Sequence, residues 1–407
     1  MRHPAVRTLA LILLVACGGK ESGESGTAPA APVQTGLGVQ LRHLDGSPLT
    51  GARVRISDSA GEGTSADPDA AGMTVFKDLP LGTTQVEVIT DGFTTQHAIV
   101  DVVDGRMGGV QFNLKETSST SVDPATPTVI TDGTLTVTLP VGSVIPAATT
   151  TGTATTTGGL VPLTYAILKP EESTAIPGNL ERFVPEVGPE SIDVLSAFQI
   201  RKPIGVEFTG PAEVRVSTPP DSPFREPTLY LYTFAPDTGY WRRGQALVLE
   251  GDEKWAEMGN LGWWAIGKPA ESTACLNGRV IDDDGEPLAG AELLAIQDDA
   301  IGVLRTNADE NGEFCLGVKP GPQGQYYVFG WSKTLEVVYK DAPFFLAPEG
   351  PATCLSGGCL RLGDVRPNGY TDRDGDGYYE DVGDCDDDNP DVNPSPAFGD
   401  ESFCFED

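Results

Sequence analysis

The sequence is poor in histidine and in basic residues. It has three histidines, and 27 lysines and arginines stand against 59 aspartates and glutamates, which gives a formal charge of −32. This balance argues against nucleic acid and anionic lipid headgroups as partners, because both need clustered Lys and Arg. No H-E-x-x-H, no G-x-S-x-G and no phosphate-binding glycine loop followed by Lys occurs. A carboxylate pair for glycoside hydrolysis stays open, since such residues converge only in the fold, but we expect a protein that is not an enzyme.

Long apolar runs are scarce, and the one near the N-terminus is short. Residues 9–16 form an apolar run of about eight residues, far below the roughly 20 that span a bilayer as a helix. Arg2 and Arg7 precede this run, and small residues and Cys17 follow it. A positive start, a short apolar core and small residues at the cut are typical of an export signal.

The end of this signal, Leu-Val-Ala-Cys at residues 14–17, resembles the lipobox of bacterial lipoproteins. By that resemblance residues 1–16 are a signal peptide and Cys17 is lipidated, with palmitate among its acyl chains, so that it anchors the chain to the bacterial cell envelope. Gly18, in place of Asp, implies sorting to the outer membrane, on its periplasmic face or at the cell surface. The alternatives are a conventionally cleaved signal and an uncut anchor.

Two segments have the composition of linkers. Residues 17–36 are rich in Gly, Ser, Ala and Pro and cannot bury apolar area, so we expect a flexible, lipid-anchored tether. Residues 116–127 are rich in Ser and Thr and are predicted to be a second linker.

Most of the remaining chain has the pattern of β-structure. Glycine and proline are abundant, with 49 and 33 residues, and short runs alternate between apolar and polar positions. Runs of this kind between Asp-Gly and Pro-Gly turns indicate antiparallel strands with one buried face. We expect an all-β protein of tandem antiparallel β-sandwich modules, the first over residues 37–115, the second over 128–269 and the third over 270–366.

One eight-residue motif, called the repeated phrase below, occurs twice in the sequence. Asp-Gly-Ser-Pro-Leu-Thr-Gly-Ala at residues 45–52 returns as Asp-Gly-Glu-Pro-Leu-Ala-Gly-Ala at residues 284–291, with matching strands downstream. The motif resembles the carboxypeptidase regulatory-like (transthyretin-like) β-sandwich, over 37–115 and 270–366. In that family the module is an accessory, so the resemblance implies a fold and no chemistry. The central segment, 128–269, resembles the antiparallel sandwiches that lie between such modules in bacterial surface proteins.

Tryptophans gather in the central segment. We consider Trp241, Trp263 and Trp264 as ligand-binding residues, because aromatic platforms bind glycans in many β-sandwiches. The alternative is that they fill the core, the commoner fate at strand spacing. Neighbours on a strand face opposite sides, so Trp263 or Trp264 is expected to reach the far face or a contact between domains.

Cysteine is absent between Cys17 and Cys275, and six cysteines follow in the last third of the chain. An even number in an exported chain indicates disulfides, and six thiols allow fifteen pairings. Metal ligation is the alternative, but no C-x-x-C and no neighbouring His accompany them. We expect each pair to fall within one module, which gives the pairs Cys275–Cys315, Cys354–Cys359 and Cys385–Cys404.

The C-terminal segment, residues 370–407, is acidic and has few apolar residues. Its Asp-x-Asp-x-Asp-Gly start matches the beginning of an EF-hand-type calcium loop, but Gly383 stands where a bidentate Glu is expected. The segment resembles the thrombospondin type 3-like acidic repeats of bacterial surface proteins, which implies a small loop-rich tail with structural calcium. The implied ligands are Asp372, Asp374, Asp376, the carbonyl of Tyr378, Asp384, Asp386 and Asn389. The alternative is a disordered acidic tail.

Together these features predict a non-catalytic, lipid-anchored scaffold of the cell surface or envelope with a calcium-stabilised end. Its expected contacts are the membrane, through the anchor, and glycans or other envelope proteins. A glycan-binding surface protein that uses exposed aromatics of the central segment is the alternative function.

Overall fold

A computed structural model of the chain describes residues 35–58, 63–146, 159–178, 181–184, 188–270, 274–282, 285–297, 304–318, 324–331, 337–344, 354 and 358–367. The regular structure in these ranges is almost entirely β-strand, accompanied by two short 3₁₀ helices, η1 (Pro170–Ala175) and η2 (Pro223–Arg225). Within the same ranges we find no helix with the length and apolarity that a bilayer crossing requires.

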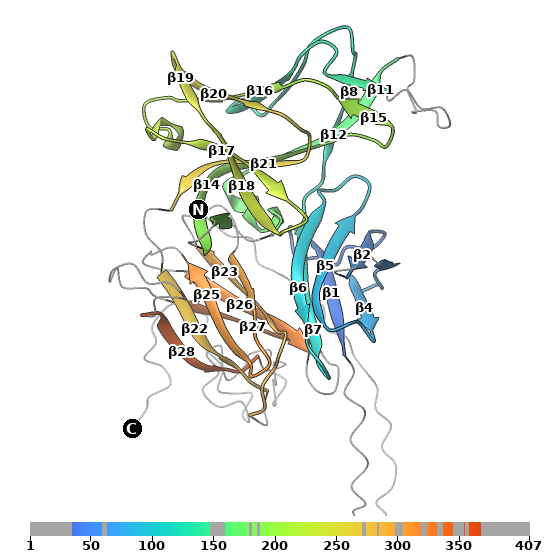
Figure 1. Ribbon diagram of the computed structural model, residues 1–407, viewed down its shortest axis with the longest axis vertical. Helices are drawn as coiled ribbons and strands as arrows, with labels where there is room; N and C mark the ends of the chain where they lie inside the picture. The colour runs from blue at the N-terminus through green and yellow to red at the C-terminus, as the bar shows by residue number, and fades with distance from the viewer. Residues whose placement is uncertain are drawn as a thin grey trace, which may run out of the picture. The chain divides into compact units, whose positions relative to one another are not determined.

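The first module is a sandwich of a three-stranded and a four-stranded sheet (Figure 1, blue and cyan). The order in the first sheet is β4-β1-β7, and in the second β3-β2-β5-β6. The strands are β1 (Gly36–His43), β2 (Arg53–Ser57), β3 (Gly63–Ala66), β4 (Met73–Lys77), β5 (Gly82–Ile89), β6 (Gln96–Val102) and β7 (Met107–Leu114). Alternate residues of β2, β5 and β6 point into the core, as the period-two pattern predicts.

The segment that carries the repeated phrase folds in the same way. Its sheets have the orders β25-β22-β28 and β24-β23-β26-β27, which match those of the first module strand for strand (Figure 1, orange and brown). The strands are β22 (Ala274–Val280), β23 (Glu292–Gln297), β24 (Leu304–Asn307), β25 (Glu313–Val318), β26 (Gly324–Trp331), β27 (Val337–Phe344) and β28 (Leu360–Val365). In both modules the last strand pairs in parallel with the first, whereas the sequence pattern had indicated antiparallel strands alone.

The repeated phrase and the strands beside it make the same hydrogen bonds in both copies. Within the phrase, the amide of Leu49 donates to the carbonyl of Leu41 and the amide of Leu288 to that of Val280, both at 3.0 Å. The amide of Leu41 donates to the carbonyl of Gly72 at 2.8 Å, and the amide of Val280 donates to that of Gly312 at 2.7 Å. Both glycines have positive φ, at 74° and 75°, and an added Cβ would lie within 2.4 Å of a backbone carbonyl. Only glycine fits this turn, because the conformation is left-handed and the neighbouring strand is in contact. The repeat is therefore a repeat of structure as well as of sequence.

The central segment forms two further sheets that pack face to face, as a sandwich does. One has the order β19-β20-β16-β10-β9; the other has the order β18-β17-β21-β14-β12-β8, with β13 paired to β14, and β11 pairs separately with β15. The strands of the first sheet are β9 (Thr128–Thr131), β10 (Leu135–Leu139), β16 (Ala212–Ser217), β19 (Val248–Glu250) and β20 (Glu253–Met258). The others are β8 (Ser118–Val122), β11 (Val144–Pro146), β12 (Val161–Leu168), β13 (Glu181–Val184), β14 (Gly188–Arg201), β15 (Val206–Phe208), β17 (Tyr230–Ala235), β18 (Tyr240–Ala246) and β21 (Trp263–Pro269). The prediction of tandem β-sandwich modules is confirmed.

The inner strands β14, β17 and β21 of the larger central sheet are buried on both faces. One face packs against the other central sheet, with Phe198, Leu231 and Ile266 in the cluster. Tyr232 and Ala265, on the opposite face, belong to a second cluster that also holds the core of the repeated module. A sheet in this position needs apolar side chains at successive residues, which explains the run of buried positions in β21.

The structure differs from the sequence prediction at residues 116–127. This segment contains β8, which pairs with β12 and forms the edge of the larger central sheet. A Ser- and Thr-rich composition is compatible with an exposed edge strand, because threonine favours strands and an edge has a solvated side. Composition alone therefore mistook an edge strand for a linker.

A buried ion pair joins β23 and β24 to β7 of the first module. The backbone amide of Gln111 donates to Oε2 of Glu292 at 2.7 Å, and Nη1 of Arg305 donates to the carbonyl of Gln111 at 2.8 Å. Arg305 also donates to Oε1 of Glu292 at 3.0 Å, and the two side chains are 9% and 3% exposed. The amide of Gly109 adds a bond to the carbonyl of Gly290 at 3.1 Å. Burial raises the pKa of Glu292, while the charge of Arg305 and the amide of Gln111 oppose that rise.

Replacing Glu292 by Ala leaves the guanidinium of Arg305 buried without its carboxylate. We expect a loss of about 3–5 kcal/mol in the free energy of unfolding. The exposed pair Arg242–Asp237, with side chains 61% and 67% exposed, supplies the matched control. Asp237→Ala should cost less than about 1 kcal/mol. Urea denaturation followed by tryptophan fluorescence measures both, and equal losses would contradict the role of the buried pair.

Candidate functional site

Several predicted site residues lie outside the residues that the structure describes. They are the lipidation residue Cys17, the calcium ligands Asp372, Asp374, Asp376, Tyr378, Asp384, Asp386 and Asn389, and the cysteines Cys385 and Cys404. These assignments stay predictions. The tryptophans Trp241, Trp263 and Trp264, the four cysteines of the repeated module and the contacts between modules are described.

The neighbouring tryptophans of β21 face opposite sides, as expected for a strand. Trp264 packs between the two central sheets, and its Nε1 donates to the carbonyl of Asn260 at 3.1 Å. Trp263 lies on the other face and donates from Nε1 to the carbonyl of Thr95, in the first module, at 2.9 Å. The expectation that one of the pair reaches a contact between domains is therefore confirmed.

The three tryptophans do not form an exposed platform. Trp241, Trp263 and Trp264 are 1%, 4% and 5% exposed, and Trp241 packs against Phe234 with ring centroids 5.4 Å apart. An aromatic glycan platform needs ring faces open to solvent, and these three rings are buried. They fill cores and a module junction because indole rings bury a large apolar area.

Polar side chains hold the first module against the central segment. Gln199, on β14, accepts from the amide of Thr95 at 3.1 Å and donates to its hydroxyl. Arg201 donates from Nη1 to the carbonyls of Thr90 and Phe93, both at 3.1 Å. Gln96, fully buried, donates to the carbonyl of Ala175. These bonds satisfy backbone carbonyls that would otherwise be buried without partners.

A cavity of about 450 Å³ opens beside this junction. Its lining includes Glu87, His97, Arg201, Lys202, Asn260 and Trp263. The volume lies in the range of small-molecule pockets, and the lining offers hydrogen-bonding groups beside one indole. A small hydroxyl-rich molecule fits this chemistry, but the amide of Gln199 and the guanidinium of Arg201 are already hydrogen-bonded to the first module. Two side chains that line the cavity therefore also hold the first module.

His97 is a titratable group that the junction buries. Burial first, and the charge of Arg201 second, lower its pKa from 6.5 to about 4. Its Nδ1 lies 4.0 Å from a carboxylate oxygen of Glu87, and its ring lies 5.7 Å from that of Phe234. The imidazole is consequently neutral in the folded protein at neutral pH.

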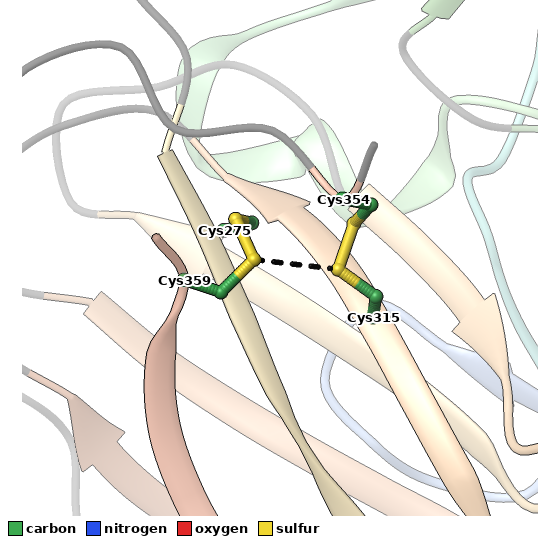
Figure 2. Close-up of side chains that lie close together, drawn as sticks. All are labelled: Cys275, Cys315, Cys354 and Cys359. Atoms are coloured by element: carbon green, nitrogen blue, oxygen red, sulfur yellow. Dashed lines mark hydrogen bonds between the residues drawn. A yellow bond between two sulfur atoms is a disulfide. The ribbon is translucent and has the colours of Figure 1, made fainter. Parts of the chain in front are cut away.

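The four cysteines of the repeated module come together, with a pairing that differs from the predicted one (Figure 2). The disulfides are Cys275–Cys359 and Cys315–Cys354, with Cα atoms 4.6 and 5.7 Å apart. The predicted pairs Cys275–Cys315 and Cys354–Cys359 are wrong. The reason is the parallel pairing of β28 with β22, which sets Leu360 opposite Leu276 and so brings Cys359 beside Cys275. The third predicted pair, Cys385–Cys404, lies outside the described residues.

Sequence reasoning missed the residues that join the modules. Glu292 follows the second copy of the repeated phrase, where Arg53 follows the first. Arg53 is exposed, whereas Glu292 is 2% exposed. The change from a basic to an acidic residue at the same position of the repeat is visible in the sequence. The burial of Glu292 is not, because it arises only when the modules pack together.

The pKa of His97 predicts an acid-sensitive junction. The folded-state pKa lies below that of the unfolded chain, so the stability is fully present above about pH 6.5 and is lost as the pH falls toward and through 4. The difference corresponds to about 3 kcal/mol at full protonation. His97→Gln removes this titration, so its deficit relative to wild type at about pH 8 should shrink as the pH falls. The measurement is the free energy of unfolding in urea, for wild type and His97→Gln, at about pH 8 and about pH 4. A difference between the two proteins that is the same at both pH values would refute the assignment.

Comparisons with known proteins place the chain in no family. It matches no family model, and no curated protein matches it in sequence. The Bacillus anthracis TIE protein has 11% identity and a TM-score of 0.20, over 83% of this chain and 51% of that one. BcpA, the major pilin subunit of Bacillus cereus, has 10% identity and a TM-score of 0.19, over 82% and 99%. SpaD, a major pilin of Corynebacterium diphtheriae, has 11% identity and a TM-score of 0.19, over 83% and 98%. The chain thus spans about half the length of the first of these proteins.

Proposed function

We propose that this protein is a non-catalytic, lipid-anchored scaffold of the bacterial envelope, with an acidic, calcium-stabilised C-terminal segment. The observation that carries the proposal is the use of polar side chains at the module junctions. Gln199, Arg201, Glu292 and Arg305 each bind backbone groups of the first module. These polar side chains could have bound a ligand, but they hold one β-sandwich module to the next. This use suits a rigid spacer that presents or connects other components of the envelope.

The anchor is supported by the sequence at the N-terminus. The Leu-Val-Ala-Cys stretch ends an export signal, and the Gly-, Ser- and Pro-rich segment 17–36 has the composition of a tether. Eighteen residues of such a chain reach about 25 Å on average, enough to lift a folded module clear of the headgroups. Because acylation and the tether leave the folded modules free, their surfaces remain open to glycans or other envelope proteins.

The anchor is tested by replacing Cys17 with Ser in the producing bacterium. We expect the variant to lose palmitate labelling and to move from the detergent phase to the aqueous phase on Triton X-114 partition, because a thioether-linked lipid can form only on the thiol. Cys404→Ser is the matched control and should stay in the detergent phase. A variant at residue 17 that partitions like wild type would disprove the anchor.

Calcium binding by the tail is supported by carboxylate spacing. The segment 370–407 has fourteen acidic residues and one basic residue, Arg373, and close carboxylates repel one another without a counterion. In a segment with little apolar area, the free energy of ion binding becomes folding free energy. We propose a structural role, with an affinity in the weak extracellular range of about 10⁻⁴ M.

Limited proteolysis tests the calcium site. With millimolar calcium the tail should resist cleavage, and chelation should expose it, because the ion replaces a hydrophobic core. The double variant Asp374→Asn with Asp376→Asn should be cleaved at the chelated rate in either condition. Asp221→Asn with Asp252→Asn, a change of equal charge in the central segment, serves as the control. If the tail of the wild-type protein is cleaved at the same rate with calcium and with chelator, the tail is disordered and the proposed site is wrong.

A further inference from the structure

The four cysteines of the repeated module form one compact sulfur cluster. Cys275 lies on β22 and Cys315 on β25, while Cys359 directly precedes β28 and Cys354 lies on the preceding loop. All four Sγ atoms lie within 4.8 Å of one another, and Sγ of Cys315 is 3.6 Å from Sγ of Cys359, across the two disulfides. Figure 2 shows the two disulfides side by side, with this contact dashed.

We infer that this cluster is also a metal site: when both disulfides are reduced, the four thiolates bind one Zn²⁺. Tetrahedral zinc with four thiolates at about 2.3 Å has its sulfurs about 3.8 Å apart. The contact between Cys315 and Cys359 already has nearly this length, and the farthest pair exceeds it by about 1 Å. The bonded sulfurs only have to separate, which a side-chain rotation allows.

The strand pairing holds the ligands in place in either state. Cys275 and Cys315 are diagonal neighbours, because Asn277 lies opposite Cys315 in the antiparallel pair of β22 and β25. Residues two apart on a strand share a face, so both thiols lie on the same side of the sheet. Cys359 enters from the parallel neighbour on the other side of β22. Three hydrogen-bonded strands therefore keep three of the four sulfurs together after the disulfides open.

The conversion balances with a dithiol reductant. Each disulfide takes two electrons and two protons to give two thiols, and one dithiol is oxidised to its own disulfide in the exchange; two dithiols are consumed per chain. Zinc then binds the thiolates and releases their protons to solvent. Cys354 is exposed and Cys359 half-buried, so each disulfide offers a sulfur to the reductant.

The ligand set selects the metal. Thiolates are soft ligands that favour zinc and disfavour calcium, which takes oxygen ligands. Four cysteines in a closed arrangement match structural zinc sites and leave no open position for a substrate. The cluster is thus distinct from the acidic tail, and the inference stands whether or not the tail binds calcium or the chain is anchored.

The test uses the full chain with Cys17, Cys385 and Cys404 replaced by Ser, so that four cysteines remain. After reduction with a phosphine under nitrogen, we expect about one zinc per chain, and cobalt in its place should give thiolate-to-cobalt charge-transfer absorption. The oxidised chain should give no such absorption. Cys315→Ser with Cys354→Ser in the same background leaves two ligands and should lower the affinity at least tenfold.

A second readout needs no further variant. Zinc should slow the alkylation of all four cysteines by iodoacetamide in the reduced chain, which intact mass measures directly. Equal alkylation with and without zinc, or cobalt absorption no stronger than in the two-ligand variant, would overturn the site. Because the two-ligand variant keeps the acidic tail, zinc bound there by carboxylates appears equally in both chains and is not counted as support.

Discussion

The contact between the first module and the repeated one is built around a buried ion pair. Glu292 and Arg305 are removed from water, which costs several kcal/mol per charge, and their mutual attraction offsets this only when the remaining hydrogen-bonding positions are filled. The backbone of Gln111 supplies two of these partners, since its amide binds the carboxylate and its carbonyl binds the guanidinium. Both contacts require β7 in place. A different docking of the modules would leave the two buried charges without these backbone partners.

A similar logic governs the central segment. The inner strands of its larger sheet are buried on both faces, and the polar side chains near the first module bind main-chain groups there. Thr95 alone receives contacts from Gln199 and Trp263. Sandwich modules connected by flexible linkers need no such contacts. Their presence indicates that the first module and the central segment are in direct contact, and the cavity at His97 is lined by residues of both.

The cysteine cluster adds a covalent constraint at the third module. Two disulfides connect β22, β25 and the segment before β28, and the closing strand is parallel to the first, as in the first module. The first module has the same strand order without any cysteine, so the fold does not require the disulfides. The cysteine cluster is therefore a feature of the second copy that the first copy lacks. The main-chain hydrogen bonds of β22 with β25 and β28 keep its sulfurs close together.

The amino-acid sequence alone determined the local structure. Period-two patterning located the strands, and the repeated Asp-Gly and Pro-Leu phrase predicted two equivalent modules, because turn geometry depends on a few adjacent residues. It also predicted that Trp263 and Trp264 diverge. The tertiary structure decided what depends on packing between distant segments: the parallel closing strands, and with them the disulfide pairing; the edge-strand role of β8; and the burial of Glu292, whose counterpart Arg53 is exposed. The contact of Glu292 with Gln111, for example, joins residues about 180 positions apart. Such contacts depend on which surfaces meet, and no local sequence pattern specifies that.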